Sequence, residues 1–162
     1  AVGLICLEVF GYRHIRAKEA AVSLGLGMQL TNIIRDLRED NENGRIYLPI
    51  DEMEYFGYTE TDLDRGIMNH NFLDLMHFQA QRARIFFGEG FALLPLLPLR
   101  SRACPTILHG LYYRLLDRIE ERGFDVFSRR ISLSASEKVR LTAKLWTISL
   151  IPRLGNKPNL SS

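Results

Sequence analysis

Residues 29–49 contain a row of oxygen-bearing side chains at helical spacing, and this pattern restricts the local fold more than any other part of the chain. Asn32, Asp36 and Asp40 follow one another at intervals of four residues. Because each residue of an α-helix turns the chain by about 100°, these three side chains and Gln29 share an arc of roughly 80°. The neighbouring arc is apolar and consists of Leu26, Leu30, Ile33, Ile34 and Leu37. The pattern therefore predicts a helix with one buried stripe and one stripe of oxygen ligands.

Such a row of oxygen ligands suits a hard divalent cation. Mg²⁺ takes oxygen ligands, keeps part of its water and is usually held by a few carboxylates together with substrate phosphate. Gly44 is expected to end the helix in the left-handed conformation, which places Asp36 and Asp40 near the negative end of the helix dipole. A bound cation would offset that cost. The alternative is a solvated, charged helix end that Arg35 and Arg38 partly neutralise, and spacing alone leaves both interpretations open.

The remainder of the chain predicts helices joined by short loops, so the expected fold class is all-α. Apolar residues at helical spacing predict helices over residues 16–43, 71–94, 106–122 and 134–151. Pro49 predicts a loop over residues 44–54. Thr59 or Thr61 can cap the helix that follows, and Ser134 or Ser136 can cap the last one, with Glu137 three residues after Ser134 as in a capping box. Gly25 and Gly27, inside the first of these helices, each cost roughly 1 kcal/mol against Ala and are acceptable if another helix or a substrate approaches closely.

Composition excludes several classes of function. The 162 residues carry a net charge of only +2, and without a long basic run a nucleic-acid partner is not expected. Cys6 and Cys104 are isolated, which is typical of reduced thiols in a cytoplasmic protein. The four histidines are scattered and receive no ligand role, and no segment is long enough to span a bilayer.

Three blocks of the sequence carry a resemblance to a known family. Gln29-Leu-Thr-Asn-Ile-Ile-Arg-Asp-Leu-Arg-Glu-Asp40, followed by Gly44-Arg-Ile-Tyr-Leu-Pro49, closely resembles the second aspartate-rich motif of the squalene and phytoene synthase family. Residues 1–12 resemble the helix and turn before that motif, and residues 110–130 resemble the penultimate helix and the basic turn after it. The resemblance implies an isoprenoid-synthase helical bundle around a central cavity.

One departure from the family pattern concerns the first aspartate-rich motif. The family carries two such motifs on facing helices, whereas residues 1–27 contain no Asp and the chain starts without Met. We therefore expect a bundle truncated at the N-terminus, in which residues 1–154 are the C-terminal part of a single isoprenoid-synthase domain and residues 155–162 are a disordered tail. This piece alone is expected to be inactive.

The resemblance implies an Mg²⁺-dependent prenyltransferase that joins two isoprenyl diphosphates head to head. The blocks at residues 9–12 and 120–127 favour the conversion of farnesyl diphosphate to presqualene diphosphate and squalene, with NADPH needed only if squalene is the product. The alternative is a phytoene synthase that acts on two geranylgeranyl diphosphates. An alternative of another class is a non-catalytic helical relative, although such a protein would usually have lost the carboxylates that this chain retains.

The resemblance also implies roles for individual residues. The metal ligands would be Asn32, Asp36 and Asp40, and the catalytic groups would be Asp36, Asp40 and Tyr112. The residues that bind diphosphate would be Gln29, Arg45 and Arg129, with Arg130 taking the place of Arg129 if the register differs by one.

Residues 141–154 combine apolar and basic side chains. This segment is expected either to pack on the bundle, with Trp146 as a core anchor, or to make peripheral contact with a membrane. The sequence leaves the oligomeric state open.

Overall fold

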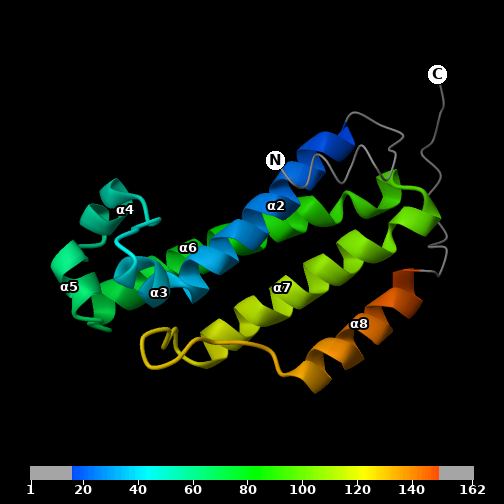
Figure 1. Cartoon of the computed structure of the whole chain (residues 1–162). Coiled ribbons are helices and arrows are strands. Elements are labelled where there is room, and N and C mark those ends of the chain that lie inside the picture. Colours follow the sequence, from blue (N-terminus) through cyan, green and yellow to red (C-terminus); the bar gives the residue numbers. More distant parts are fainter. Residues whose placement is uncertain (1–15, 150–162) are drawn as a thin grey trace.

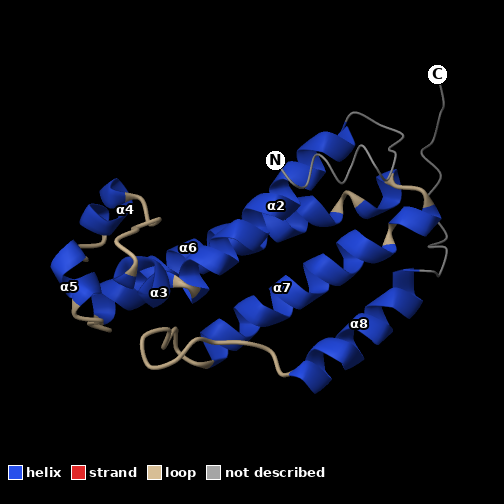
Figure 2. Ribbon diagram, in the orientation of Figure 1, coloured by secondary structure: helices blue, strands red, loops and turns tan. Residues whose placement is uncertain are grey.

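The computed structural model describes residues 16–149, and every regular element in that range is a helix (Figure 2). In chain order the helices are α2 (Arg16–Arg35), α3 (Leu37–Glu42), α4 (Ile50–Tyr55), α5 (Glu60–Asp64), α6 (His70–Phe91), the 3₁₀ turns η1 (Leu94–Leu96) and η2 (Leu99–Ser101), α7 (Ala103–Glu121) and α8 (Ala135–Ser149). The all-α expectation is confirmed for these residues. The features expected in residues 1–12 and in the tail at 155–162 lie outside the described residues.

The long helices pack in pairs (Figure 1). Helix α2 lies along α6, and α7 lies along α8 while also contacting both α2 and α6. The short helix α5 contacts α3 near the end of the α2–α6 pair. Helix α2, which carries Gln29 and Asn32 of the polar row, therefore packs on α6 and also contacts α7.

Glycines allow α2 and α6 to approach closely. A Cβ atom added at Gly90 would lie 2.7 Å from the Cα atom of Leu24, and one added at Gly27 would lie 3.1 Å from the Phe87 ring. The expectation of a close approach in this helix is therefore confirmed at Gly27. At Gly25 an added Cβ would meet no heavy atom of the described residues within 4 Å, so the expectation is not supported there.

The buried core is centred on α6. Its inward face contributes fully buried side chains that α2, α7 and the connecting turns cover. Along the edge of the α6–α7 contact, the Arg84 guanidinium pairs with Glu120 and lies 2.8 Å from Asp117. Since Arg84 also lies over the ring of Tyr113, a cation joins the two helices beside the apolar core.

Local sequence signals fix several helix starts. Thr59 caps α5 in a capping box with Asp62, and the Ser134 hydroxyl accepts a hydrogen bond from the Glu137 amide at the start of α8, as the sequence predicts. The predicted loop at residues 44–54 is wrong in its second half, because α4 begins at Ile50. Pro49 precedes the helix with φ −59°, and proline tolerates this position because it needs no amide hydrogen there.

None of the helices within residues 16–149 combines the length and the apolar content that crossing a membrane requires.

We predict that two glycines of α6 respond oppositely to substitution. Gly90→Ala should lower the free energy of unfolding by about 1–3 kcal/mol, because the added methyl group overlaps the α2 backbone at Leu24. Gly88→Ala should raise it by about 1 kcal/mol, because an added Cβ meets no heavy atom of residues 16–149 within 4 Å apart from its own helix backbone. Urea unfolding of the natural protein that carries this sequence measures both changes, and equal effects would contradict the close helix contact.

Candidate functional site

The polar row lies where α2 meets α3. The predicted continuous helix is interrupted at Asp36, which has φ −97° and ψ 10° and separates the two helices. The backbone nevertheless stays in register, because the Asp36 amide donates to the Asn32 carbonyl and the Asp40 amide donates to the Asp36 carbonyl, both at 2.8 Å. Asn32, Asp36 and Asp40 therefore follow one another at one-turn intervals, as the spacing predicts.

Asp36 is held by two guanidinium groups. Arg35 donates from Nε to Oδ1 at 2.8 Å and also bonds Oδ2, while Arg130 donates from Nε to Oδ1 at 2.9 Å. Arg130 Nε also lies 3.6 Å from a carboxylate oxygen of Glu39. Partial burial acts to raise the pKa of Asp36, but the Arg35 and Arg130 guanidiniums outweigh it and hold the pKa below its usual value.

Asp40 lies in the opposite electrostatic situation. Burial, followed by the negative charges of Asp36 and Glu39, raises the pKa of its carboxyl, and Arg45 and Arg35 only partly oppose this shift. Asp40 is thus the carboxylate in this row that lacks sufficient positive charge, so a bound cation would stabilise its ionised form.

The end of α3 places Arg45 beside Asp40. Gly44 adopts φ 69°, which confirms the predicted left-handed stop, and the Arg45 amide donates to the Asp40 carbonyl at 2.9 Å. This bond is that of a Schellman ending, so the position of Arg45 follows from the helix stop itself. The Arg45 side chain is exposed.

Tyr112 comes to the site from α7. It is half-buried against the core, and it lies near enough to Arg35 to contribute to the raised pKa of that guanidinium, for which the Asp36 hydrogen bond is the main cause. Gln29 is exposed on α2. The structure therefore brings Tyr112 to the end of α2 where the carboxylates lie, whereas the roles proposed for Tyr112 and Gln29 stay predictions.

Residues 123–130, here called the basic turn, carry Arg129 and Arg130. The turn begins with a Schellman ending of α7, in which the Phe124 amide donates to the Ile119 carbonyl at 3.0 Å. Phe124 has φ 59°, a strained conformation for a residue with a Cβ, and its ring is 1% exposed. The buried ring thus fixes a conformation that the backbone alone disfavours.

The structure distinguishes the two arginines of the basic turn. Arg130 pairs with Asp36, whereas Arg129 is exposed and helps to lower the pKa of Asp125, whose main cause is the hydrogen bond with Ser128. The partner of Asp36 is therefore Arg130, which the sequence left as the alternative to Arg129. Diphosphate binding by Arg129 stays a prediction.

The donor set fits Mg²⁺ in part. Asn32 Oδ1 is buried and has no hydrogen-bond partner among residues 16–149, and an amide oxygen in that state suits a metal or its bound water. Within residues 16–149, however, no three Asp, Glu, His or Cys side chains gather into a group able to hold a metal ion. A magnesium ion here would therefore draw further oxygens from water, from a diphosphate or from outside the described residues.

Sequence reasoning missed one member of this cluster. Arg38 was treated only as a neutralising charge, yet its Nη1 donates to the Phe127 carbonyl at 2.5 Å, 89 residues away in sequence. A backbone carbonyl leaves no trace in the sequence, and therefore no pattern could have revealed this contact.

Comparison with known proteins shows what the chain resembles. Residues 1–137 match the family model described as squalene/phytoene synthase. The phytoene synthase of Mycobacterium tuberculosis is 39% identical over 145 residues, which cover 88% of this chain and 48% of that protein. The phytoene synthase of Arthrospira platensis is 42% identical over 125 residues, covering 75% of this chain and 40% of the relative. The chain thus spans about half the length of the curated relatives it matches.

A solved structure supports the same fold. The squalene synthase of Alicyclobacillus acidocaldarius superposes with a TM-score of 0.72 at 25% identity, covering 76% of this chain and 47% of that one. The phytoene synthases are more similar in sequence than this squalene synthase. The comparisons therefore favour the phytoene alternative over the squalene interpretation that the sequence blocks suggested.

We predict that the pKa of the Asp36 carboxyl depends on Arg130 and not on Arg129. Arg130→Gln should raise this depressed pKa towards its ordinary value, because one of two guanidiniums is lost. The stability that the remaining Arg35–Asp36 pair contributes at neutral pH should then be smaller, and it should be lost at a higher pH as the solution is acidified. Carboxyl ¹³C NMR titration measures the pKa, with Arg129→Gln as the matched control. If only Arg129→Gln shifts the pKa of Asp36, then Arg129 and not Arg130 is the partner of this carboxylate.

Proposed function

Because the chain belongs to the squalene/phytoene synthase family, we propose that the natural protein carrying it joins two isoprenyl diphosphates head to head, with two geranylgeranyl diphosphates giving phytoene. The observation that supports this most is the preserved row of Asn32, Asp36 and Asp40 at one-turn spacing. Farnesyl diphosphate as substrate, giving squalene with NADPH, is the second candidate and is supported by the shared fold with a squalene synthase.

The proposed metal site uses Asn32, Asp36 and Asp40 as its ligands. When bound, Mg²⁺ would supply Lewis-acid stabilisation of the departing diphosphate. Asn32 offers an amide oxygen without a competing partner, and Asp40 offers a carboxylate in a negatively charged surrounding. Arg35 and Arg130 stabilise the ionised form of Asp36. Gln29 would orient water or diphosphate at the exposed end of the row.

The arginines of the site would hold the diphosphate. Guanidinium groups bind phosphate oxygens through paired, charge-assisted hydrogen bonds. Arg45 is placed next to Asp40 by the helix stop, while Arg129 and Arg130 come from the basic turn. Positive groups from two separate segments would thus flank the leaving group, and Tyr112 would line the cavity beside them.

The rival of another class, a non-catalytic helical relative, is not favoured by the site. Such a protein would gain nothing from a buried amide oxygen without a partner or from a row of carboxylates at a helix end, both of which cost free energy. Since the relatives are about twice as long, we also propose that residues 1–162 alone form no product.

Replacement of Asp36 tests the proposed function. In the natural protein with Mg²⁺, Asp36→Ala should lower product formation from geranylgeranyl diphosphate at least a hundredfold, because a metal ligand and the partner of two arginines are lost. Product analysis by chromatography measures the yield, and the same assay with farnesyl diphosphate identifies the substrate class. Asp51→Ala, an exposed carboxylate at the start of α4, is the matched control. Near-normal turnover of Asp36→Ala would remove the ligand assignment.

Peripheral membrane contact is a further part of the proposal, and α8 is the candidate surface. Trp146 is 53% exposed and Val139 is 70% exposed among the described residues, so the core-anchor expectation for Trp146 is not supported. Exposed Lys138, Arg140 and Lys144 lie on the same helix. Apolar side chains beside basic ones suit the surface of an anionic membrane.

We predict that Trp146→Gln together with Val139→Gln reduces binding to vesicles. The double variant should cosediment several-fold less with phosphatidylglycerol vesicles than the natural protein, since two apolar contacts with the lipid are lost. Ile85→Gln on α6, which removes another exposed apolar side chain, should leave cosedimentation unchanged. Equal losses in both variants, or none in either, would refute α8 as the contact surface.

A further inference from the structure

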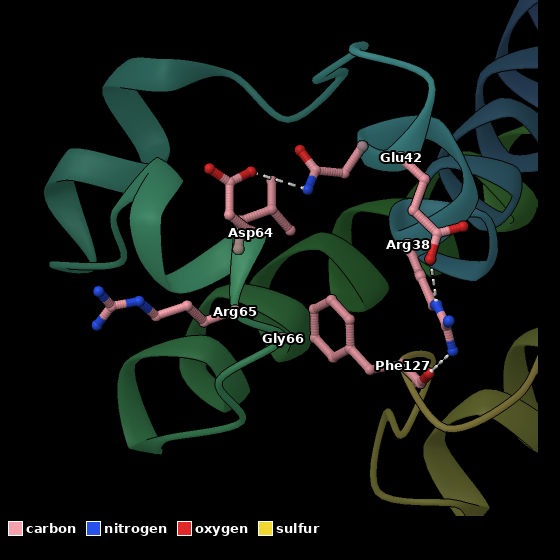
Figure 3. A pocket seen from close by; sticks show the side chains of 8 residues that line it. Arg38, Glu42, Asp64, Arg65, Gly66 and Phe127 are labelled. Atoms are coloured by element: carbon pink, nitrogen blue, oxygen red, sulfur yellow. Dashed lines mark hydrogen bonds and ion pairs between the residues drawn. The ribbon is translucent and has the colours of Figure 1, made fainter.

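The basic turn is held on both sides of α3. On one side Arg130 pairs with Asp36, and on the other side Arg38 donates from Nη1 to the Phe127 carbonyl at 2.5 Å (Figure 3). Arg38 and Asp40 are two residues apart within α3, so they differ by about 200° around the helix axis and Arg38 lies away from the polar row. The turn therefore contacts α3 at Arg38 through the Phe127 carbonyl, and contacts the row at Asp36 through Arg130.

Arg38 is itself held in place. Its Nε donates to Glu42 at 2.7 Å, one turn further along α3. This bond fixes the guanidinium plane, and because the guanidinium presents several N–H groups in a rigid fork, another N–H remains for the Phe127 carbonyl. Arg38 thus donates to two acceptors, the Glu42 carboxylate and the Phe127 carbonyl, as Figure 3 shows.

Phe127 is also held through its side chain, which packs against neighbouring residues. Its ring lies 5.4 Å from the ring of Phe72 between centroids, and a Cβ added at Gly66 would lie 3.2 Å from it. Gly66 has φ 61°, so glycine suits both the backbone and the close contact. A cavity of about 280 Å³ beside this ring is lined by Arg38, Glu42, Asp64, Arg65, Gly66 and other residues.

We propose that Arg38 is a positioning residue that holds the basic turn against α3, so that Arg129 and Arg130 stand beside the polar row. Arg38 lies on the face of α3 away from that row and acts through the Phe127 carbonyl. That the turn binds a diphosphate rests on the proposed function. The positioning of the turn by Arg38 rests on the contacts alone.

The main competing explanation is simple electrostatics. A positive charge within about 10 Å of a site attracts an anion whether or not it holds a turn. Arg65 provides the matched control, because it lines the same cavity with the same charge, and its guanidinium points away from Phe127 (Figure 3). A purely electrostatic role predicts similar effects for both arginines.

The first experiment measures binding of inorganic pyrophosphate with Mg²⁺ to the natural protein by calorimetry. Arg38→Gln should weaken binding about tenfold, which corresponds to about 1.4 kcal/mol. Arg38→Lys should recover part of the loss, and Arg65→Gln should change binding less than twofold. Glu42→Ala, which keeps the Arg38 charge but removes the acceptor that orients it, should weaken binding in the same direction by a smaller factor. Equal losses for Arg38→Gln and Arg65→Gln would overturn the proposal.

A double-mutant cycle separates positioning from charge. In a background with Arg129→Gln and Arg130→Gln, adding Arg38→Gln should have no further effect on pyrophosphate binding, because the groups that Arg38 positions are gone. The full tenfold loss in that background would show that Arg38 acts directly on the anion and would overturn its role as a positioning residue.

Hydrogen exchange tests the hold on the turn independently of any ligand. Arg38→Gln should speed amide exchange in residues 124–131, and Arg65→Gln should leave it unchanged. If the natural protein does not bind pyrophosphate, the proposed function is wrong, while faster exchange in Arg38→Gln still supports the positioning role. Unchanged exchange in Arg38→Gln overturns it.

Discussion

The close packing of α2 on α6 is the contact on which the other features depend. Gly90 meets the backbone of α2 at Leu24, where a Cβ atom is excluded, and Gly27 meets the Phe87 ring, where a Cβ atom would be crowded. Protein interiors tolerate little change in volume, and a helix seated in this way has a fixed rotation about its axis. That rotation determines which face of α2 is buried and therefore where the row of Asn32, Asp36 and Asp40 lies.

The two carboxylates of the row, Asp36 and Asp40, have different electrostatic surroundings. The charge of Asp36 is compensated by two guanidiniums, which lower the pKa of its carboxyl, whereas burial and then the negative charges of Asp36 and Glu39 raise the pKa of the Asp40 carboxyl. A cation would gain most at Asp40, and an anion would find Arg130 already beside Asp36. Cation and diphosphate would thus be mutually supportive ligands of one site, which agrees with the chemistry proposed for the family.

The basic turn shows how an irregular segment becomes rigid enough to serve a site. Phe124 accepts a left-handed backbone because its ring is buried, and Phe127 is fixed by ring packing on one side and by Arg38 on its carbonyl. These contacts come from both α6 and α3, so displacement of the turn would break several contacts at once. Positioned guanidiniums lose less freedom on binding an anion than mobile ones would.

The sequence by itself determined the local features, and only the tertiary structure decided which residues of distant segments contact one another. Helical spacing predicted the row, Gly44 predicted its end, and the Thr59 and Ser134 caps were predicted because each depends on residues within a few positions. The start of α4 at Ile50 was missed because proline both ends and begins helices. The pairing of Asp36 with Arg130 and the hold of Arg38 on a distant carbonyl arise from packing between segments about 90 residues apart, and spacing along one helix carries no information about such contacts.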